Sequence, residues 1–90
     1  MLALVKGYNC GVYFGEIGSV VGDKVEMKDA RNLFYWKGAF NLSDMSIYGV
    51  TDPTGSHATS KVEVTLMGVD TILPLWPDAY ESLSSIPTKR

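Results

Sequence analysis

The residues that could carry nucleophilic catalysis are few, and all but Cys10 lie in one polar segment. His57 is the only histidine of the chain, and the hydroxyls of Ser56 and Ser60 or the thiol of Cys10 are the nucleophiles that it could activate. The segment around His57 is rich in Gly, Ser and Thr, so the polarity of an exposed loop explains it without any catalytic role. The sequence therefore favours a loop histidine over a general base.

Acid–base hydrolysis would need two carboxylates on one site, and the candidates are Glu16 with Glu63 or Glu26 with Asp29. On strands, such residues usually form a solvated face. The acidic residues stand singly, without the spacing of a calcium loop, and the glycines at 11, 15 and 18 do not match a phosphate-binding loop. We therefore expect a protein that is not an enzyme and that uses no metal or cofactor.

Binding chemistry is concentrated in the segment KDARNLFYWKG, residues 28–38, which places three aromatic residues side by side. Neighbouring side chains of a strand point to opposite faces. On this basis Phe34 and Trp36 share one face, which we assign to the core.

The opposite face of that strand combines Arg31, Leu33, Tyr35 and Lys37. These residue types suit a planar anion, because a ring can stack on Tyr35 while the Arg31 guanidinium binds a phosphate or carboxylate in a fork. An ordinary amphipathic face is the alternative, with Arg31 paired to an acid such as Asp29 and Tyr35 covered by a helix. Contiguous exposed aromatic surface usually marks an interface, which keeps the binding interpretation open.

The elements that position this segment are mostly short strands. Apolar alternation predicts strands at residues 1–5, 12–17, 20–28 (a hairpin around Gly22-Asp23), 31–37, 61–69 and 70–74. A helix capped by Asn41 or Ser43 and closed by Gly49 is predicted between them, and a second helix follows Pro77. The polar segment 51–60 is predicted to be a loop. The sum is an α+β fold: a small curved antiparallel β-sheet or open barrel with one or two short helices.

Length and composition set the class of protein. Ninety residues make a single domain, residues 1–90, and the formal net charge of −2 argues against binding to long nucleic acids. A single cysteine cannot form an internal disulfide, which fits a reducing cytosol. No apolar run approaches the ~18 residues of a membrane span. Because so small a core has little stability to spare, we expect a homo-oligomer whose interface uses the aromatic strand or Leu42, Met45 and Tyr48.

The runs GVYFGEI, KDARNLFYWKGAFNLSDMSIYGV and KVEVTLMGVDTILPLW resemble a family of small tailed-bacteriophage proteins of unknown function. The resemblance extends from about residue 11 to about residue 83, and its most distinctive pieces are Lys28-Asp29-Ala30-Arg31 and Tyr35-Trp36. That family has no assigned active site. What the resemblance implies is a setting, the cytoplasm of an infected host, where small non-enzymatic phage proteins counter host defence.

Two functions fit this setting. One is sequestration of a nucleotide-derived immune signal, with Arg31, Lys37 and Lys28 on the phosphates and Tyr35 on the base. Segment 51–60 would then close over the ligand and supply Ser56, His57 and Thr59. The alternative is an inhibitor that docks on a host protein through an aromatic face. A sequestering site needs positive charges that converge in a concave pocket, whereas a docking face can be flat.

Overall fold

The computed structural model describes residues 1–89. Its elements are β1 (Leu2–Gly7), β2 (Gly11–Val21), β3 (Lys24–Tyr35), α1 (Leu42–Tyr48), the 3₁₀ turn η1 (Pro53–Gly55), β4 (His57–Ala58), β5 (Val62–Leu66), β6 (Val69–Pro74) and α2 (Pro77–Ser84). The strands form one antiparallel sheet in the order β4-β3-β2-β1-β6. Strand β5 lies on the same side of β3 as β4: β5 pairs with residues 25–30 of β3, and β4 pairs with Leu33 and Tyr35. This confirms the small α+β fold with two short helices.

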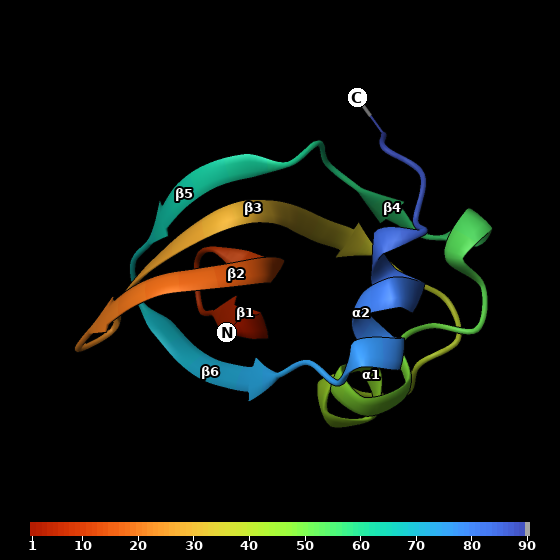
Figure 1. Ribbon diagram of the computed structural model, residues 1–90, viewed down its shortest axis with the longest axis horizontal. Helices are drawn as coiled ribbons and strands as arrows, with labels where there is room; N and C mark the ends of the chain where they lie inside the picture. The colour runs from red at the N-terminus through yellow and green to blue at the C-terminus, as the bar shows by residue number, and fades with distance from the viewer. Residues whose placement is uncertain (90) are drawn as a thin grey trace.

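The sheet is strongly curved but does not close into a barrel. Strands β5 and β6 are its two edges, and they are joined by only two residues, Met67 and Gly68 (Figure 1). The edges meet at that turn, where the amide of Val69 donates to the carbonyl of Asp23 and the amide of Tyr8 donates to that of Gly68. Away from the turn β5 and β6 do not pair with each other, so the sheet stays open along that side.

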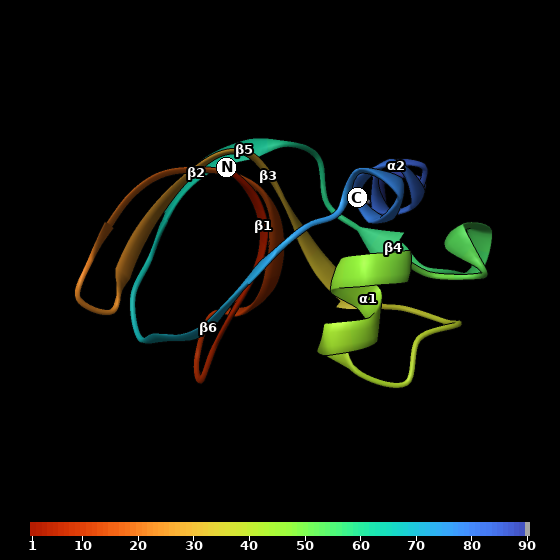
Figure 2. The ribbon, with the colours of Figure 1, turned by 60° about the horizontal axis from the view of Figure 1, so that its bottom comes forward.

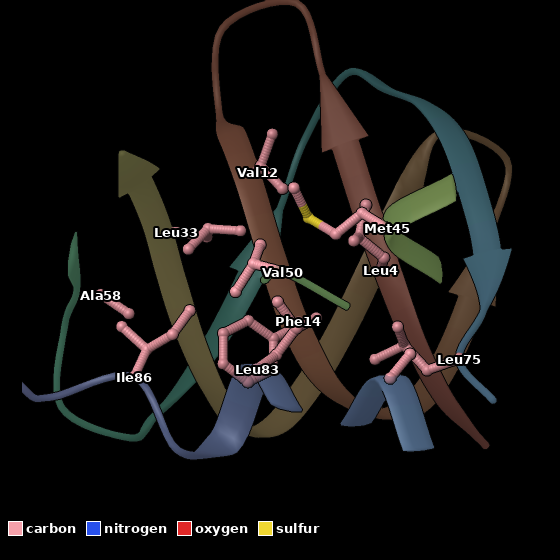
Figure 3. Close-up of a cluster of buried hydrophobic side chains, with 11 residues drawn as sticks. Leu4, Val12, Phe14, Leu33, Met45, Val50, Ala58, Leu75, Leu83 and Ile86 are labelled. Atoms are coloured by element: carbon pink, nitrogen blue, oxygen red, sulfur yellow. The ribbon is translucent and has the colours of Figure 1, made fainter. Parts of the chain in front are cut away.

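Both faces of the sheet are buried, and β1 shows this most simply. Its Ala3 and Val5 pack inside the curve of the sheet with Val25, Met27 and Leu66. Leu4, between them, points to the opposite face, which α1 and α2 cover (Figures 2 and 3). A sheet covered in this way needs a strand that is apolar on both sides, and LALV in β1 meets that need.

The core on the helix-covered face is the larger of the two. Phe14 of β2 lies among side chains from both helices and from the segments that connect them (Figure 3). Its buried members are Leu4, Val12, Phe14, Leu33, Met45, Val50, Ala58, Leu75, Ala79, Leu83 and Ile86. Met45 is therefore fully buried inside the protein, so the expectation that it forms an intersubunit contact is wrong.

Helix α1 begins and ends where the sequence predicts, and α2 begins at Pro77, one residue before its predicted start. The amide of Asp44 donates to the Asn41 side chain at the start of α1, and Gly49 closes this helix with a φ of 75°. Pro77 occupies the first turn of α2, where its missing N–H costs nothing. Within residues 1–89 no helix is long and apolar enough to cross a bilayer.

Strand β3 is a single strand of twelve residues, whereas the sequence predicts two strands separated at Asp29-Ala30. The interruption takes the form of a bulge. Phe14 pairs with Arg31 and Glu16 pairs with Lys28, so β3 has one residue more than β2 across this interval, and Asp29 adopts a φ of 50°. The bulge brings the β3 backbone close to Gly15: a Cβ there would lie 2.7 Å from the Ala30 Cα and 2.9 Å from the Asp29 carbonyl oxygen.

Segment 51–60 is not the loop that the sequence predicts. It contains η1 and the two-residue strand β4, and Ser56 and Ala58 are buried. The Ser56 hydroxyl donates to the Asp52 carbonyl and accepts from the Lys37 amide, both at 3.0 Å. Polar residues here satisfy backbone groups of neighbouring segments, so the segment is built into the sheet and the expectation of a closing lid does not fit it.

We expect Gly15→Ala to destabilise the protein by about 1–3 kcal/mol, because the added methyl group must push the backbone of the bulge away. Gly18→Ala, on the same strand, is the matched control. Its Cβ would meet nothing closer than the Glu26 carbonyl oxygen at 3.5 Å, an ordinary contact. Chemical denaturation of both variants measures the difference, and equal stabilities would contradict this account of Gly15.

Candidate functional site

The C-terminal end of β3 carries a second bulge, and this one brings aromatic side chains together. Leu33 pairs with Ala58 and Tyr35 pairs with His57. Ala58 and His57 are adjacent on β4, so Phe34 is an extra residue on β3 without a partner of its own. At such a bulge two consecutive side chains can point to the same side of the sheet. Phe34 and Tyr35 both lie against His57, with ring centroids 5.9 and 5.4 Å from it.

Two of these three rings are exposed to solvent. Phe34 and Tyr35 keep 48% and 45% of their surface accessible, and His57 is half-buried. Leu33 precedes Phe34 on β3, and Ala58 follows His57 on β4. Both side chains face the other side of the sheet and belong to the larger core. We call Phe34, Tyr35 and His57 the aromatic surface. A contiguous group of exposed rings of this kind is typical of an interaction site.

The support beneath the aromatic surface comes from residues 37 and 52–56. Asp52 caps η1 by accepting the amide of Gly55, and Ser56 links Asp52 to the backbone of Lys37. The stem of Lys37 runs beside Gly55, where a Cβ would lie 3.2 Å from its Cδ. Lys37 is therefore held next to the aromatic surface, and its side chain is exposed.

The predicted core assignment of Phe34 is wrong, and that of Trp36 is right in part. Phe34 is exposed because the bulge turns it to the same side as Tyr35. Trp36 is half-buried and packs against the larger core. Leu33, which the alternation places on the binding face, is 1% exposed and belongs to that core.

Arg31 lies in the interior, away from the aromatic surface. It is 5% exposed, and its Nε donates to the Thr59 carbonyl at 2.7 Å while Nη2 donates to the Ile86 carbonyl at 2.7 Å. Longer contacts of 3.4 Å reach the Ser84 carbonyl and the Thr88 hydroxyl. Its guanidinium carbon also lies 5.7 Å from the centre of the Phe14 ring. These contacts occupy the donors that a ligand would need, so Arg31 does not fit the predicted role on a phosphate.

The electrostatics of Arg31 follow from this burial. Burial lowers the pKa of the guanidinium, and the charge of nearby Tyr80 acts in the opposite direction. Because an arginine keeps its proton at neutral pH, a full positive charge is held here by carbonyl dipoles and a ring face. The proposed ion pair of Arg31 with Asp29 does not form within residues 1–89.

The remaining predicted site residues divide into two groups. Tyr35, Lys37, Ser56 and His57 come together at the aromatic surface, although Ser56 is buried and engaged with the backbone. Thr59 is engaged too, since its hydroxyl accepts from the Asn32 amide and donates to the Ser60 carbonyl. Lys28 lies beyond the first bulge, paired with Glu16 and beside a surface hollow that includes Glu26 and Glu63. Of the three predicted cations, only Lys37 stands next to the rings.

The exposed side chains of the aromatic surface offer hydrophobic and aromatic contacts. Within residues 1–89, no three side chains among His, Cys, Asp and Glu come together in a way that could hold a metal ion. A partner could stack on the exposed rings and place a carboxylate near Lys37. The sequence analysis did not place Phe34 on this surface. Its exposure depends on the pairing of β3 with His57-Ala58, and the sequence predicted that segment to be a loop.

Comparison with known proteins places the chain in a family. Residues 2–83 match the model of the family described as Domain of unknown function (DUF6948), and the chain belongs to that family. The match includes the aromatic surface and Arg31. No curated protein and no solved structure matches the chain.

The contacts of Arg31 predict that it is needed for stability. We expect Arg31→Ala to lower the free energy of unfolding by about 2–4 kcal/mol, because the buried carbonyl of Ile86 and the partly buried carbonyl of Thr59 lose their donor. Arg31→Lys should also destabilise, since one ammonium group cannot reproduce the fork.

The exposed Lys28, three residues earlier on β3, is the matched control, and Lys28→Ala should change stability by no more than about 0.5 kcal/mol. Urea denaturation gives the free energies. Amide hydrogen exchange at Ile86 and Lys89 gives a local measure, because loss of the guanidinium should loosen this segment first. An Arg31→Ala protein as stable as the wild type would contradict the structural role.

Proposed function

We propose that this protein is a non-enzymatic binding protein that docks on another protein through the aromatic surface. The observation that carries the proposal is the exposed pair of rings beside His57, with Phe34 stacked on the imidazole and Tyr35 tilted against it. Nothing in the fold of the chain requires rings at these positions, because Leu33 and Ala58 already fill the core behind them. Exposed aromatic residues are the side chains that most often supply the binding energy of protein interfaces.

Further apolar side chains at the same end of the molecule favour a large partner over a small ligand. The loop between β3 and α1 carries Phe40, whose side chain is fully exposed, and Tyr48 and Trp76 are exposed on α1 and before α2. This loop, both helices and β4 lie at one end of the structure, opposite the β2–β3 hairpin (Figures 1 and 2). Such a surface fits an apolar patch of a partner protein, with an acidic group of that partner next to Lys37.

The distribution of positive charge supports docking over sequestration of a nucleotide. A nucleotide-binding site would need several cations around the rings. The donors of Arg31 are bound to carbonyl groups, and Lys28 lies beyond the bulge at Asp29. The resemblance to small tailed-phage proteins supports a partner from the infected bacterium, met in the host cytoplasm, and a role against host defence.

Replacing one ring of the aromatic surface should weaken docking strongly without unfolding the protein. Immobilised wild-type protein is expected to retain a discrete protein from a bacterial lysate, and Phe34→Ser and Tyr35→Ser are expected to lose it. With the purified partner, each loss should amount to about 2 kcal/mol in binding free energy, the scale of an interface hot spot. Because both side chains are exposed, melting temperatures should stay close to that of the wild type.

The matched control is Tyr8→Ser, which removes an exposed ring from the turn between β1 and β2, a segment that contacts Gly68 instead of the helices. This variant should bind as the wild type does. Equal retention by all three variants would rule out the aromatic surface as the docking site. If no protein is retained and a cyclic dinucleotide raises the melting temperature of the wild type but not of Tyr35→Ser, sequestration replaces docking as the function.

A further inference from the structure

One side chain of the loop between β3 and α1 contacts almost nothing of its own chain. Phe40 is 101% exposed, more than any other large apolar side chain within residues 1–89. Both of its neighbours are fixed: Ala39 packs against the larger core, and the Asn41 side chain accepts from the Asp44 amide at the start of α1. The ring therefore projects from a backbone that is anchored immediately before and after it.

The rest of this loop is held by the segment that follows α1. The amide of Thr51 donates to the carbonyl of Gly38 at 3.3 Å. Gly38 has a φ of 94°, and a Cβ there would lie 2.5 Å from the Thr51 nitrogen, so this close approach requires glycine. Val50 in turn exchanges two hydrogen bonds with the Ser82 hydroxyl of α2, both at 3.0 Å. The loop that presents Phe40 is thus fixed by its contacts with the rest of the domain.

We infer that Phe40 is the anchor of the docking interaction and that it inserts into a concave apolar pocket of the partner protein. This inference rests on the proposed function and names a feature that the partner must have. The rings of Phe34 and Tyr35 each contact His57 on one side, so a flat surface can cover what remains exposed. Phe40 is free on every side, and only a pocket removes all of its surface from water.

The surface beside Phe40 leaves room for the wall of such a pocket. A hollow of about 440 Å³ is lined by Gly38, Ala39, Phe40 and Thr51. Because glycine and alanine have the smallest side chains, a partner side chain at the rim of the pocket can pack in this hollow while the ring is inserted. The partner should therefore combine a pocket for one benzyl group with an apolar side chain at its rim.

Phe40 is close enough to the aromatic surface for one partner to cover both. Tyr35 and Phe40 are five residues apart, so their Cα atoms are separated by at most about 18 Å. A standard interface of about 800 Å² per partner spans that distance. Lys37, between them, is fixed by hydrogen bonds of its amide to the Ser56 hydroxyl and of its carbonyl to the Asp52 amide. Such a preset arrangement loses little conformational freedom on binding.

A size series at position 40 tests the inference against the purified protein that the wild type retains from a bacterial lysate. Phe40→Ala should weaken binding about 30-fold or more, and Phe40→Leu should restore part of this loss. Phe40→Trp should also bind weakly, because its larger ring overfills a pocket formed for a benzyl group, whereas a flat interface would accept it. Melting temperatures should stay close to that of the wild type. Tyr8→Ala is the matched control, since it removes an 89% exposed ring from the turn between β1 and β2, and it should bind as the wild type does.

Photo-crosslinking in the lysate gives a second measurement that needs no purified partner. The benzophenone amino acid benzoylphenylalanine replaces Phe40, Tyr35 or Tyr8 in separate preparations. Positions 40 and 35 should crosslink to the same protein, and the site reached from position 40 should lie in an apolar pocket of that protein. Position 8 should give no crosslink to it.

The outcomes separate this inference from the proposed function. If Phe34→Ser and Tyr35→Ser lose binding but Phe40→Ala binds as the wild type does, the anchor is overturned and the aromatic surface remains the docking site. Undiminished binding by Phe34→Ser and Tyr35→Ser would contradict the proposed function instead. Undiminished binding by Phe40→Trp would overturn the pocket, and crosslinks from position 40 to a second copy of the chain would overturn the inference. A wild type that retains no protein contradicts both.

Discussion

One buried guanidinium connects parts of the chain that are far apart in sequence. Arg31 leaves β3 and donates to carbonyl groups of Thr59, beyond β4, and of Ile86, beyond α2. No carboxylate of residues 1–89 forms an ion pair with it, so the charge is held by several carbonyl dipoles and by the Phe14 ring. Removing such a group leaves buried acceptors without a donor, and the position of β4 and of residues 84–88 therefore depends on β3.

The direction of Arg31 depends in turn on the bulge at Asp29. Val25 and Met27 point inside the curve of the sheet, and strict alternation would send Arg31 and Leu33 to the same side. The extra residue reverses this, so that Ala30 completes the inner cluster and Leu33 joins the helix-covered core. Gly15 makes the bulge sterically feasible because it has no side chain to oppose the approaching backbone.

The second bulge separates the buried part of β3 from the exposed aromatic surface. Between Asp29 and Leu33 the side chains of β3 hold the fold together, and from Phe34 onward they face solvent. Two consecutive exposed rings on a regular strand would point in opposite directions, whereas here both meet His57. The short strand β4 is needed for this arrangement because it supplies the residue against which both rings lie.

Local sequence signals determined most of the elements. Alternating apolar residues located the strands, and Asn41, Gly49 and Pro77 located the ends of the helices, because these signals depend only on near neighbours along the chain. The residue types of Tyr35, Lys37 and His57 also indicated them as candidates for a site, and the structure places these residues near one another.

Tertiary structure alone decided which side of β3 each residue occupies. A bulge is set by pairing between strands that are distant in sequence, and a single extra residue moves every later side chain to the other face. For this reason Arg31 became part of the interior and Phe34 became part of the surface, although the alternation within residues 31–37, taken as a separate strand, predicts the reverse for both.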